Sequence, residues 1–105
     1  MSRVDAGFRE QIQTLVAQIP KGKVMTYGQL ASLAGAAWAA WEVGQIAHIG
    51  LADLPWQRVV NKHGGLANGY PGGKKGHKAA LEADGIIVNQ DYTVPIMELL
   101  WWPNK

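Results

Sequence analysis

The sequence predicts a mainly helical domain with a small β element. Three features support this prediction: a helical repeat of apolar residues near the start, a capping signal that opens a helix-turn-helix pattern, and short β-prone segments in the second half. The chain has 105 residues, of which 48% are hydrophobic. A chain of this size can bury one modest core, so we expect residues 1–105 to form a single domain.

The first expected helix covers residues 5–19. Its apolar side chains recur every three or four positions, so they form one face that can pack on a core. Pro20 and Gly22 follow directly and should end the helix. The residues with this spacing are Val4, Phe8, Ile12, Leu15, Val16 and Ile19.

A capping box predicts the start of a second helix. The Thr26 hydroxyl can accept a hydrogen bond from the Gln29 N–H, and the Gln29 side chain can reach back to the Thr26 N–H. This short helix should run to about Ala34, because Gly35 then ends it.

A third helix over residues 36–49 would complete a helix-turn-helix pattern, with a glycine at the bend. At about 100° per residue, its small apolar side chains fall on one face, which we expect to be buried. They are Ala36, Ala39, Ala40, Val43, Ile46 and Ala47. Another face should point outward, where a recognition helix meets its ligand. It carries Trp38, Trp41, Gln45 and His48.

The second half of the chain is richer in extended segments and turns. Residues 54–60 predict an extended segment, and residues 62–65 predict a turn. A helix through residues 78–84 should follow, and residues 85–94 resemble a small hairpin. The tail at residues 99–103 is apolar, so we expect it to dock on the body of the domain.

Charge is unevenly spread, although the net charge is only +2. Residues 21–78 hold a net of +5, and residues 79–105 hold a net of −3. The glycine-rich segment 68–76 is expected to be a basic loop, in which Lys74 and Lys75 can contact a phosphate backbone. Scattered, solvated lysines account for this distribution about equally well.

The residue inventory excludes several classes of site. The absence of cysteine removes disulfides, thiolate metal sites and thiol nucleophiles, and it fits a cytoplasmic protein. The spacing of His48, His63 and His77 does not resemble a metal site. We expect the first two on the surface and the third in the basic loop. No cofactor is expected, and no apolar run near the start suggests a secretory signal or a membrane span.

With these elements placed, the chain resembles the alkyltransferase-like proteins, the non-catalytic relatives of O6-alkylguanine-DNA alkyltransferase. The match runs from about Phe8 to Pro103, and the order and spacing of its motifs support it. These motifs are Ile19-Pro20-Lys21-Gly22-Lys23-Val24, Thr26-Tyr27-Gly28, Val43-Gly44, Pro55-Trp56-Gln57-Arg58-Val59-Val60-Asn61, Leu81-Glu82-Ala83-Asp84-Gly85 and the closing Trp102-Pro103.

Two replacements separate this chain from the active members of that wider family. Those enzymes use a Cys to take the alkyl group off guanine and a His to help deprotonate it. Trp56 and Gln57 occupy these positions here. An indole N–H is only a donor, and an amide is not a base, so both chemical roles are lost together. We therefore expect no catalytic residue and no enzymatic activity.

The resemblance implies a winged helix-turn-helix domain of the alkyltransferase C-terminal-domain type. Such a domain enters the minor groove and rotates an alkylated guanine out of the duplex into a pocket. The implied ligand is double-stranded DNA containing O6-alkylguanine, bound by a monomer that associates with the nucleoid. The implied partners are nucleotide excision repair proteins, in bacteria the damage-recognition ATPase of that pathway.

The resemblance also implies roles for particular residues. Tyr27 would press on the phosphate of the flipped nucleotide, Arg58 would brace the pocket strand, and Trp56 would form part of the pocket wall. Trp41 stands where the family carries an Arg finger, and Asp84 is expected to be structural. The lesion-pocket residues would be Tyr27, Pro55, Trp56, Gln57, Arg58 and Val59. The DNA-binding residues would be Thr26, Tyr27, Gln29, Trp38, Trp41, Gln45, Lys74 and Lys75.

Other interpretations of these residues stay open at the level of sequence. Trp56 can be a buried core aromatic, and Tyr27 can be an ordinary residue of a first helical turn. Trp38 and Trp41 can form a protein–protein patch, because exposed tryptophans mark binding hot spots for either kind of partner. The alternative functions are a helix-turn-helix DNA-binding protein without lesion specificity and a protein-interaction module.

Overall fold

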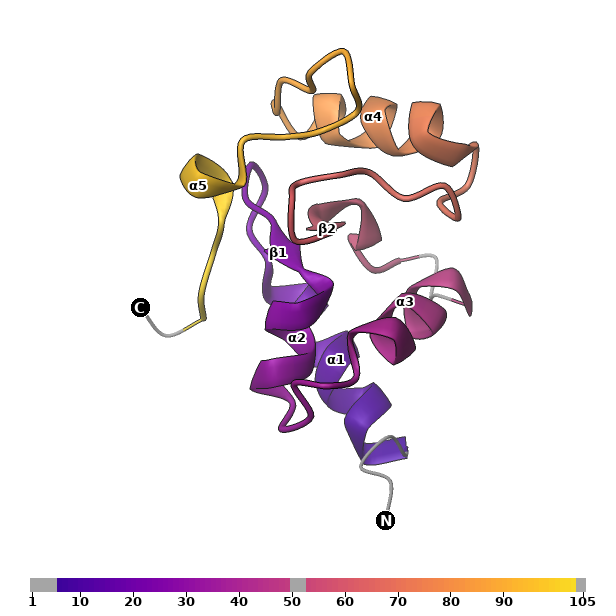
Figure 1. Cartoon of the computed structure of the whole chain (residues 1–105), viewed down its shortest axis with the longest axis vertical. Coiled ribbons are helices and arrows are strands. Elements are labelled where there is room, and N and C mark those ends of the chain that lie inside the picture. The colour runs from indigo at the N-terminus through magenta and orange to yellow at the C-terminus, as the bar shows by residue number, and fades with distance from the viewer. Residues whose placement is uncertain (1–5, 50–52, 104–105) are drawn as a thin grey trace.

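The computed structural model describes residues 6–49 and 53–103, and it confirms the predicted mainly helical fold with a small β element (Figure 1). In chain order the elements are α1 (Ala6–Gln18), β1 (Met25–Thr26), α2 (Tyr27–Leu33), α3 (Ala40–Ile49), the 3-10 turn η1 (Trp56–Arg58), β2 (Val59–Val60), α4 (Gly73–Ala83) and α5 (Ile96–Leu99). β1 and β2 pair in parallel, with Met25 opposite Val59.

The two N-terminal helices form as the sequence predicts. α1 buries Phe8, Ile12 and Val16 along one face. α2 opens with the predicted capping box, in which the Gln29 N–H donates to Thr26 Oγ1 at 3.0 Å and the Thr26 N–H donates to Gln29 Oε1 at 3.1 Å. Such a cap contributes about 1 kcal/mol, so two residues fix where this helix begins.

α3 is shorter than predicted, because it begins at Ala40 and not at residue 36. Residues 36–39 form a turn in which the Ala39 N–H donates to the Ala36 carbonyl at 2.8 Å. Gly35 has a left-handed φ of +88°, so the chain leaves α2 in a direction that does not continue directly into a helix. The predicted buried face is confirmed for Ala36, Ala39, Val43 and Ile46, while Ala40 and Ala47 are half-buried.

The prediction of one extended segment over residues 54–60 is only partly right. The Arg58 N–H donates to the Pro55 carbonyl at 3.0 Å, which closes the 3-10 turn η1. Only Val59 and Val60 are extended, where they pair with β1. The proline favours this turn because its ring restricts φ just before it.

The predicted hairpin at residues 85–94 is not formed as two paired strands. Its turn exists, since the Asn89 N–H donates to the Thr93 carbonyl at 2.8 Å. The next backbone groups pair elsewhere: the Val94 N–H donates to the Gly64 carbonyl at 2.9 Å, and the Leu66 N–H donates to the Tyr92 carbonyl at 3.0 Å. Residues 92–94 therefore pair with the distant residues 64–66, whereas the hairpin prediction paired them with residues 86–88.

The glycine-rich basic segment is also different from the prediction, because much of it is helical. α4 begins at Gly73, so Lys74 and Lys75 lie on its first turn and not in a loop. Gly72 and Gly73 have φ values of +83° and +70°, which suit glycine at the helix entry. A Cβ on Gly76 would lie 2.1 Å from the Pro71 carbonyl oxygen. These glycines permit a tight helix start.

The C-terminal tail docks on the body, as predicted. The Val24 N–H donates to the Leu99 carbonyl at 3.0 Å, and the Trp101 N–H donates to the Val24 carbonyl at 2.9 Å. The Gln29 side chain also donates to the Trp101 carbonyl. None of the helices in the described ranges is long and apolar enough to cross a bilayer.

Buried side chains form two hydrophobic clusters. The first joins α1, α2, α3 and η1, and it includes Trp56. The second lies among β2, α4 and the segments that follow α4, and it includes Leu81 and Val94. η1 and β2 are consecutive, so the chain passes from one cluster to the other at the segment that carries the candidate site.

Candidate functional site

Trp56 opens η1 and lies in the first hydrophobic cluster, with 8% of the residue exposed. Tyr27 and Tyr70 are half-buried and pack against the same cluster. Burial raises the pKa of the Tyr27 hydroxyl above its ordinary value, so this group stays neutral near pH 7. Trp56 is thus buried, as the interpretation of this residue as a core aromatic predicts.

The indole N–H of Trp56 distinguishes it from an ordinary core residue. In residues 6–49 and 53–103, Trp56 Nε1 is the one buried side-chain nitrogen or oxygen without a hydrogen-bond partner in the protein. A buried Trp usually pairs its N–H, and an unpaired buried donor costs about 1–3 kcal/mol. Trp56 therefore offers a donor that the surrounding protein does not use.

Arg58 holds η1 in place through three charge-assisted hydrogen bonds. Its Nε and Nη2 atoms donate to the two carboxylate oxygens of Asp84 at 2.8 and 3.0 Å, and its Nη1 donates to the Ile19 carbonyl at 2.8 Å. The hydrogen bonds between the two side chains lower the pKa of Asp84 and raise the pKa of Arg58. The pair connects η1 with the residue after α1 and with the C-terminal end of α4.

Gln57 has neighbours that suit a structural position and not a base. Its side-chain amide donates to Asp84 Oδ2 at 3.3 Å. The backbone carbonyl oxygen of Gln57 lies 2.7 Å from Nε2 of His77. On the other side of the ring, His77 Nδ1 accepts a hydrogen bond from the Ala67 N–H at 3.0 Å. Because Nδ1 accepts, Nε2 carries the proton and the ring is neutral. Burial lowers the pKa of His77, which is consistent with this state.

His77 is the residue that sequence reasoning misplaced. The prediction put it in a basic loop, whereas it is completely buried on α4 and stacks on Tyr70, with ring centroids 4.8 Å apart. The sequence patterns predict no role for Tyr70. The spacing of His77 and Leu81, four residues apart, could have indicated an inward helix face if the histidine had been counted as a core residue.

Two residues that the sequence predicts in the lesion pocket flank η1, and two predicted DNA-binding residues lie at the start of α2. Pro55 precedes η1 and is half-buried, and Val59 is completely buried where β2 begins. Gln29 is buried. Its side chain accepts a hydrogen bond from the Thr26 N–H and donates one to the Trp101 carbonyl. The Thr26 hydroxyl accepts from the Gln29 N–H. Both capping residues therefore fix the start of α2.

The exposed face of α3 matches the prediction, although Trp38 lies in the turn before the helix. Trp38 is 61% exposed and Trp41 is 70% exposed, and Gln45 and His48 are also exposed. The loop before α4 approaches the C-terminal end of this face at Gly69, where a Cβ would lie 3.4 Å from His48 Nδ1.

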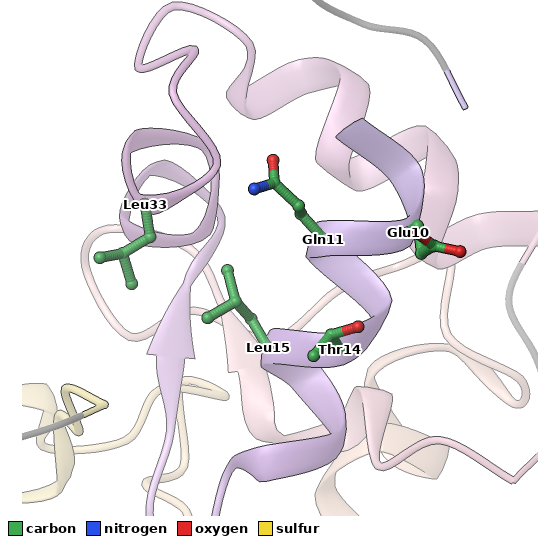
Figure 2. A pocket seen from close by; sticks show the side chains of 5 residues that line it. All are labelled: Glu10, Gln11, Thr14, Leu15 and Leu33. Carbon is green, nitrogen blue, oxygen red and sulfur yellow. The ribbon is translucent and has the colours of Figure 1, made fainter. Parts of the chain in front are cut away.

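A hollow elsewhere on the surface does not include these residues. It is lined by Glu10, Gln11, Thr14 and Leu15 of α1 and by Leu33 of α2, whose side chains Figure 2 shows around it. In the described part of the chain, no three His, Cys, Asp or Glu side chains gather as they would around a metal ion.

The fold is shared with known proteins. Residues 7–86 match the family described as the DNA binding domain of 6-O-methylguanine DNA methyltransferase. Alkyltransferase-like protein 1 of Schizosaccharomyces pombe is 32% identical over 103 residues, which cover 91% of this chain and 95% of that protein. This chain is an alkyltransferase-like protein.

Other relatives support the same assignment. A DNA base-flipping protein of Escherichia coli is 35% identical over 96 residues, which cover 90% of this chain and 74% of that protein. The crystal structure of S. pombe Atl1 in complex with damaged DNA containing O6-carboxymethylguanine has a TM-score of 0.83 and 31% identity, and it covers 91% of this chain and 95% of that one. As an alkyltransferase-like protein without cysteine, the chain has no thiol that could accept an alkyl group.

Proposed function

We propose that this protein binds O6-alkylguanine in duplex DNA by nucleotide flipping, without turnover. The observation that carries the proposal is Trp56, a buried ring with an unused donor at the position where the enzymes of the wider family have their reactive thiol. The frame around it is intact, since Arg58 and Asp84 fix the turn on which it lies. The replacement removes the reactive thiol and keeps the Arg58–Asp84 contacts that fix the turn.

Entry of a base requires movement at this site. Trp56 is 8% exposed, so an everted guanine can lie against the ring only if neighbouring side chains shift. Tyr27 and Tyr70 are half-buried aromatics that pack on the same cluster, and in this proposal they are the side chains that move. Eversion costs a few kcal/mol in unstacking and less for a poorly paired, damaged base, which favours the lesion.

The docking surface in this proposal is the helix-turn-helix formed by α2 and α3, which enters the minor groove. Trp41 would occupy the place left by the flipped base, as apolar side chains do in other minor-groove proteins. Lys74 and Lys75 on the first turn of α4 would contact phosphates, with Gln45 on the outer face of α3. Tyr27 would press on the phosphate of the flipped nucleotide.

The biological role in this proposal is recognition that leads to repair by other proteins. A protein that binds a lesion without removing it is useful only if it marks that lesion. We infer that nucleotide excision repair proteins, with a damage-recognition ATPase among them, read the complex. We also infer that residues 1–105 act as one domain and as a monomer, in the cytoplasm and on the nucleoid.

The test is a gel-shift comparison of two duplexes that differ by one O6-methylguanine. We expect at least about tenfold tighter binding to the damaged duplex, equivalent to about 1.4 kcal/mol. Trp56→Phe keeps an aromatic ring and removes the N–H, so it should reduce this preference. Trp102→Phe, on the half-exposed tail, is the matched control and should keep it. Equal affinity of the unmodified protein for both duplexes would argue strongly against lesion recognition.

A second candidate function is DNA binding without lesion specificity. The observation that favours it is Trp41, since an indole does not supply the charge or the hydrogen bonds of a guanidinium. It predicts equal binding to the two duplexes and a steep dependence on salt concentration. The same gel-shift experiment, repeated over a range of salt concentrations, separates the two candidates.

A further inference from the structure

We propose that His77 is a positioning residue for lesion recognition, which fixes the turn that carries Trp56 relative to the loop that carries Tyr70. The inference rests on the proposed function and deepens it, because it names the residue on which the preference for alkylated guanine depends. His77 is completely buried, so it acts through its neighbours and not by contact with the base.

The His77 ring makes three contacts with two separate segments of the chain. Its Nε2 donates to the Gln57 carbonyl at 2.7 Å, and its Nδ1 accepts from the Ala67 N–H at 3.0 Å. Its face stacks on Tyr70, with ring centroids 4.8 Å apart and the planes inclined by 16°. A neutral imidazole is the one uncharged side chain with a donor nitrogen and a separate acceptor nitrogen in a flat ring. Any other residue type therefore loses at least one of these contacts.

The Gln57 carbonyl is the backbone group through which His77 holds η1. The two carbonyls before it, those of Pro55 and Trp56, accept backbone N–H groups that close the turn. The Gln57 carbonyl accepts from the His77 ring. Because Gln57 follows Trp56 directly, this hydrogen bond fixes the backbone that carries the indole.

α4 holds η1 at two points that lie on one face of the helix. Asp84 follows His77 by seven residues, which is about two helical turns. Asp84 accepts from the side chains of Gln57 and Arg58, whereas His77 binds the backbone of the turn. Two separate points prevent the turn from rotating about either one.

The other edge of the His77 ring holds the loop before α4. The Ala67 N–H donates to the ring, and the Ala67 carbonyl accepts from the Tyr70 N–H at 3.3 Å. Tyr70 packs against the same hydrophobic cluster as Trp56. The hydrogen bond at Ala67 therefore keeps the loop backbone in place while the Tyr70 side chain moves.

Fixed surroundings of the base make a pocket selective. A lesion is recognised by contacts to the everted base, whereas contacts to phosphates bind damaged and undamaged duplexes alike. A displaced pocket wall weakens the first kind of contact and leaves the second. Loss of the His77 hydrogen bonds should therefore lower the affinity for the damaged duplex and leave the affinity for the undamaged duplex nearly unchanged.

The experiment measures the preference as a ratio of two affinities, by fluorescence anisotropy with two duplexes of one sequence, one of which carries an O6-methylguanine. His77→Leu keeps an apolar side chain and removes both hydrogen bonds, so it should lower the ratio about fivefold, the effect of about one neutral hydrogen bond. Leu81→Val is the matched control, because Leu81 is also completely buried on α4. It should lower thermal stability and keep the ratio.

Two amide variants show which contact matters. A Gln side chain is long enough to donate to the Gln57 carbonyl, whereas a shorter Asn side chain reaches only the Ala67 N–H. His77→Gln should therefore keep more of the preference than His77→Asn. This comparison decides the question where His77→Leu does not fold, as judged by circular dichroism.

Three results would overturn the positioning role. They are an unchanged ratio in folded His77→Leu, an equal loss of the ratio in Leu81→Val, and equal ratios in the two amide variants. The first would mean that the imidazole is dispensable for recognition. The second and third would mean that it fills space in the core and does not direct η1.

The DNA-free protein separates this inference from the proposed function. The indole N–H resonance of Trp56, assigned with Trp56→Phe in isotope-labelled protein, reports the surroundings of the ring. His77→Leu should shift this resonance, and Leu81→Val should leave it in place. Equal affinity of the unmodified protein for both duplexes would contradict the lesion pocket, and the resonance would then decide whether His77 positions Trp56. A lesion preference that His77→Leu leaves unchanged would support the pocket and contradict the positioning role.

Discussion

Two regions of this molecule present tryptophan in opposite ways. Trp56 is 8% exposed on a turn that is tied to distant segments, whereas Trp38, in the turn before α3, is 61% exposed and Trp41, on the first turn of α3, is 70% exposed. Arg58 connects the Trp56 turn to Ile19 and Asp84. The outer face of α3 has its backbone fixed by the core and its side chains directed to solvent.

This contrast predicts which property each substitution should change. Near Trp56, long-range contacts make the site part of the folded core, so changes there should alter stability and ligand preference together. On the α3 face, the side chains contribute little to the core, so changes there should alter binding alone. The following substitutions test this division.

The largest expected effect is on stability, from Asp84→Ala. The substitution leaves the Arg58 guanidinium without its carboxylate in a largely buried site, where the two side chains are only 17% and 8% exposed. Breaking such a pair should cost about 2–3 kcal/mol, or on the order of 10 °C in Tm. Urea and thermal denaturation measure it. Asp53→Ala, at an exposed position, is the control and should unfold like the unmodified protein.

The next effect is on affinity, from Trp41→Arg. This change places a cation and hydrogen-bond donors at the position proposed to fill the vacated base site, and the gain should be about tenfold for O6-methylguanine DNA. Stability should stay within about 0.5 kcal/mol, because the position is exposed. Gel-shift titration measures the gain, and Trp102→Arg controls for added charge. Unchanged or weaker affinity would place Trp41 outside the base-vacancy site.

The smallest effect is a pH dependence of stability from His77. Burial lowers the pKa of this imidazole in the folded state, so the unfolded chain takes up the proton first as the pH falls. The contribution to stability is therefore complete above the unfolded pKa of about 6.5 and is lost progressively below it. Protonation of Nδ1 would also remove its hydrogen bond from Ala67.

Thermal denaturation between about pH 7.5 and 5 measures this loss, above the acid range in which carboxylates titrate. His77→Gln should give a flatter profile over that range, and His63→Gln, at an exposed position, should not. An identical pH profile in His77→Gln and the unmodified protein would mean that this imidazole does not control stability in that window.

The predictable part of the fold is the part with local causes. The residues of the Thr26–Gln29 cap lie close together in the sequence, and successive residues of the apolar face of α1 are only three or four positions apart. Both features are present as predicted. The errors share a different origin. The segment at residues 92–94 pairs with residues 64–66, and glycines read as loop residues permit the start of α4. Local patterns do not show partners that are almost thirty residues away.

The same division applies to the candidate site. Residue type alone establishes that the chain has no cysteine and that Trp56 and Gln57 stand where the enzymes have their reactive pair, because side-chain chemistry follows from the residue. The folded structure is needed to show that the Trp56 N–H is buried without a partner in the protein and that His77 hydrogen-bonds to the backbone carbonyl of Gln57. Burial and hydrogen bonding depend on which distant segments meet, and the packing of η1 against α4 brings these segments together.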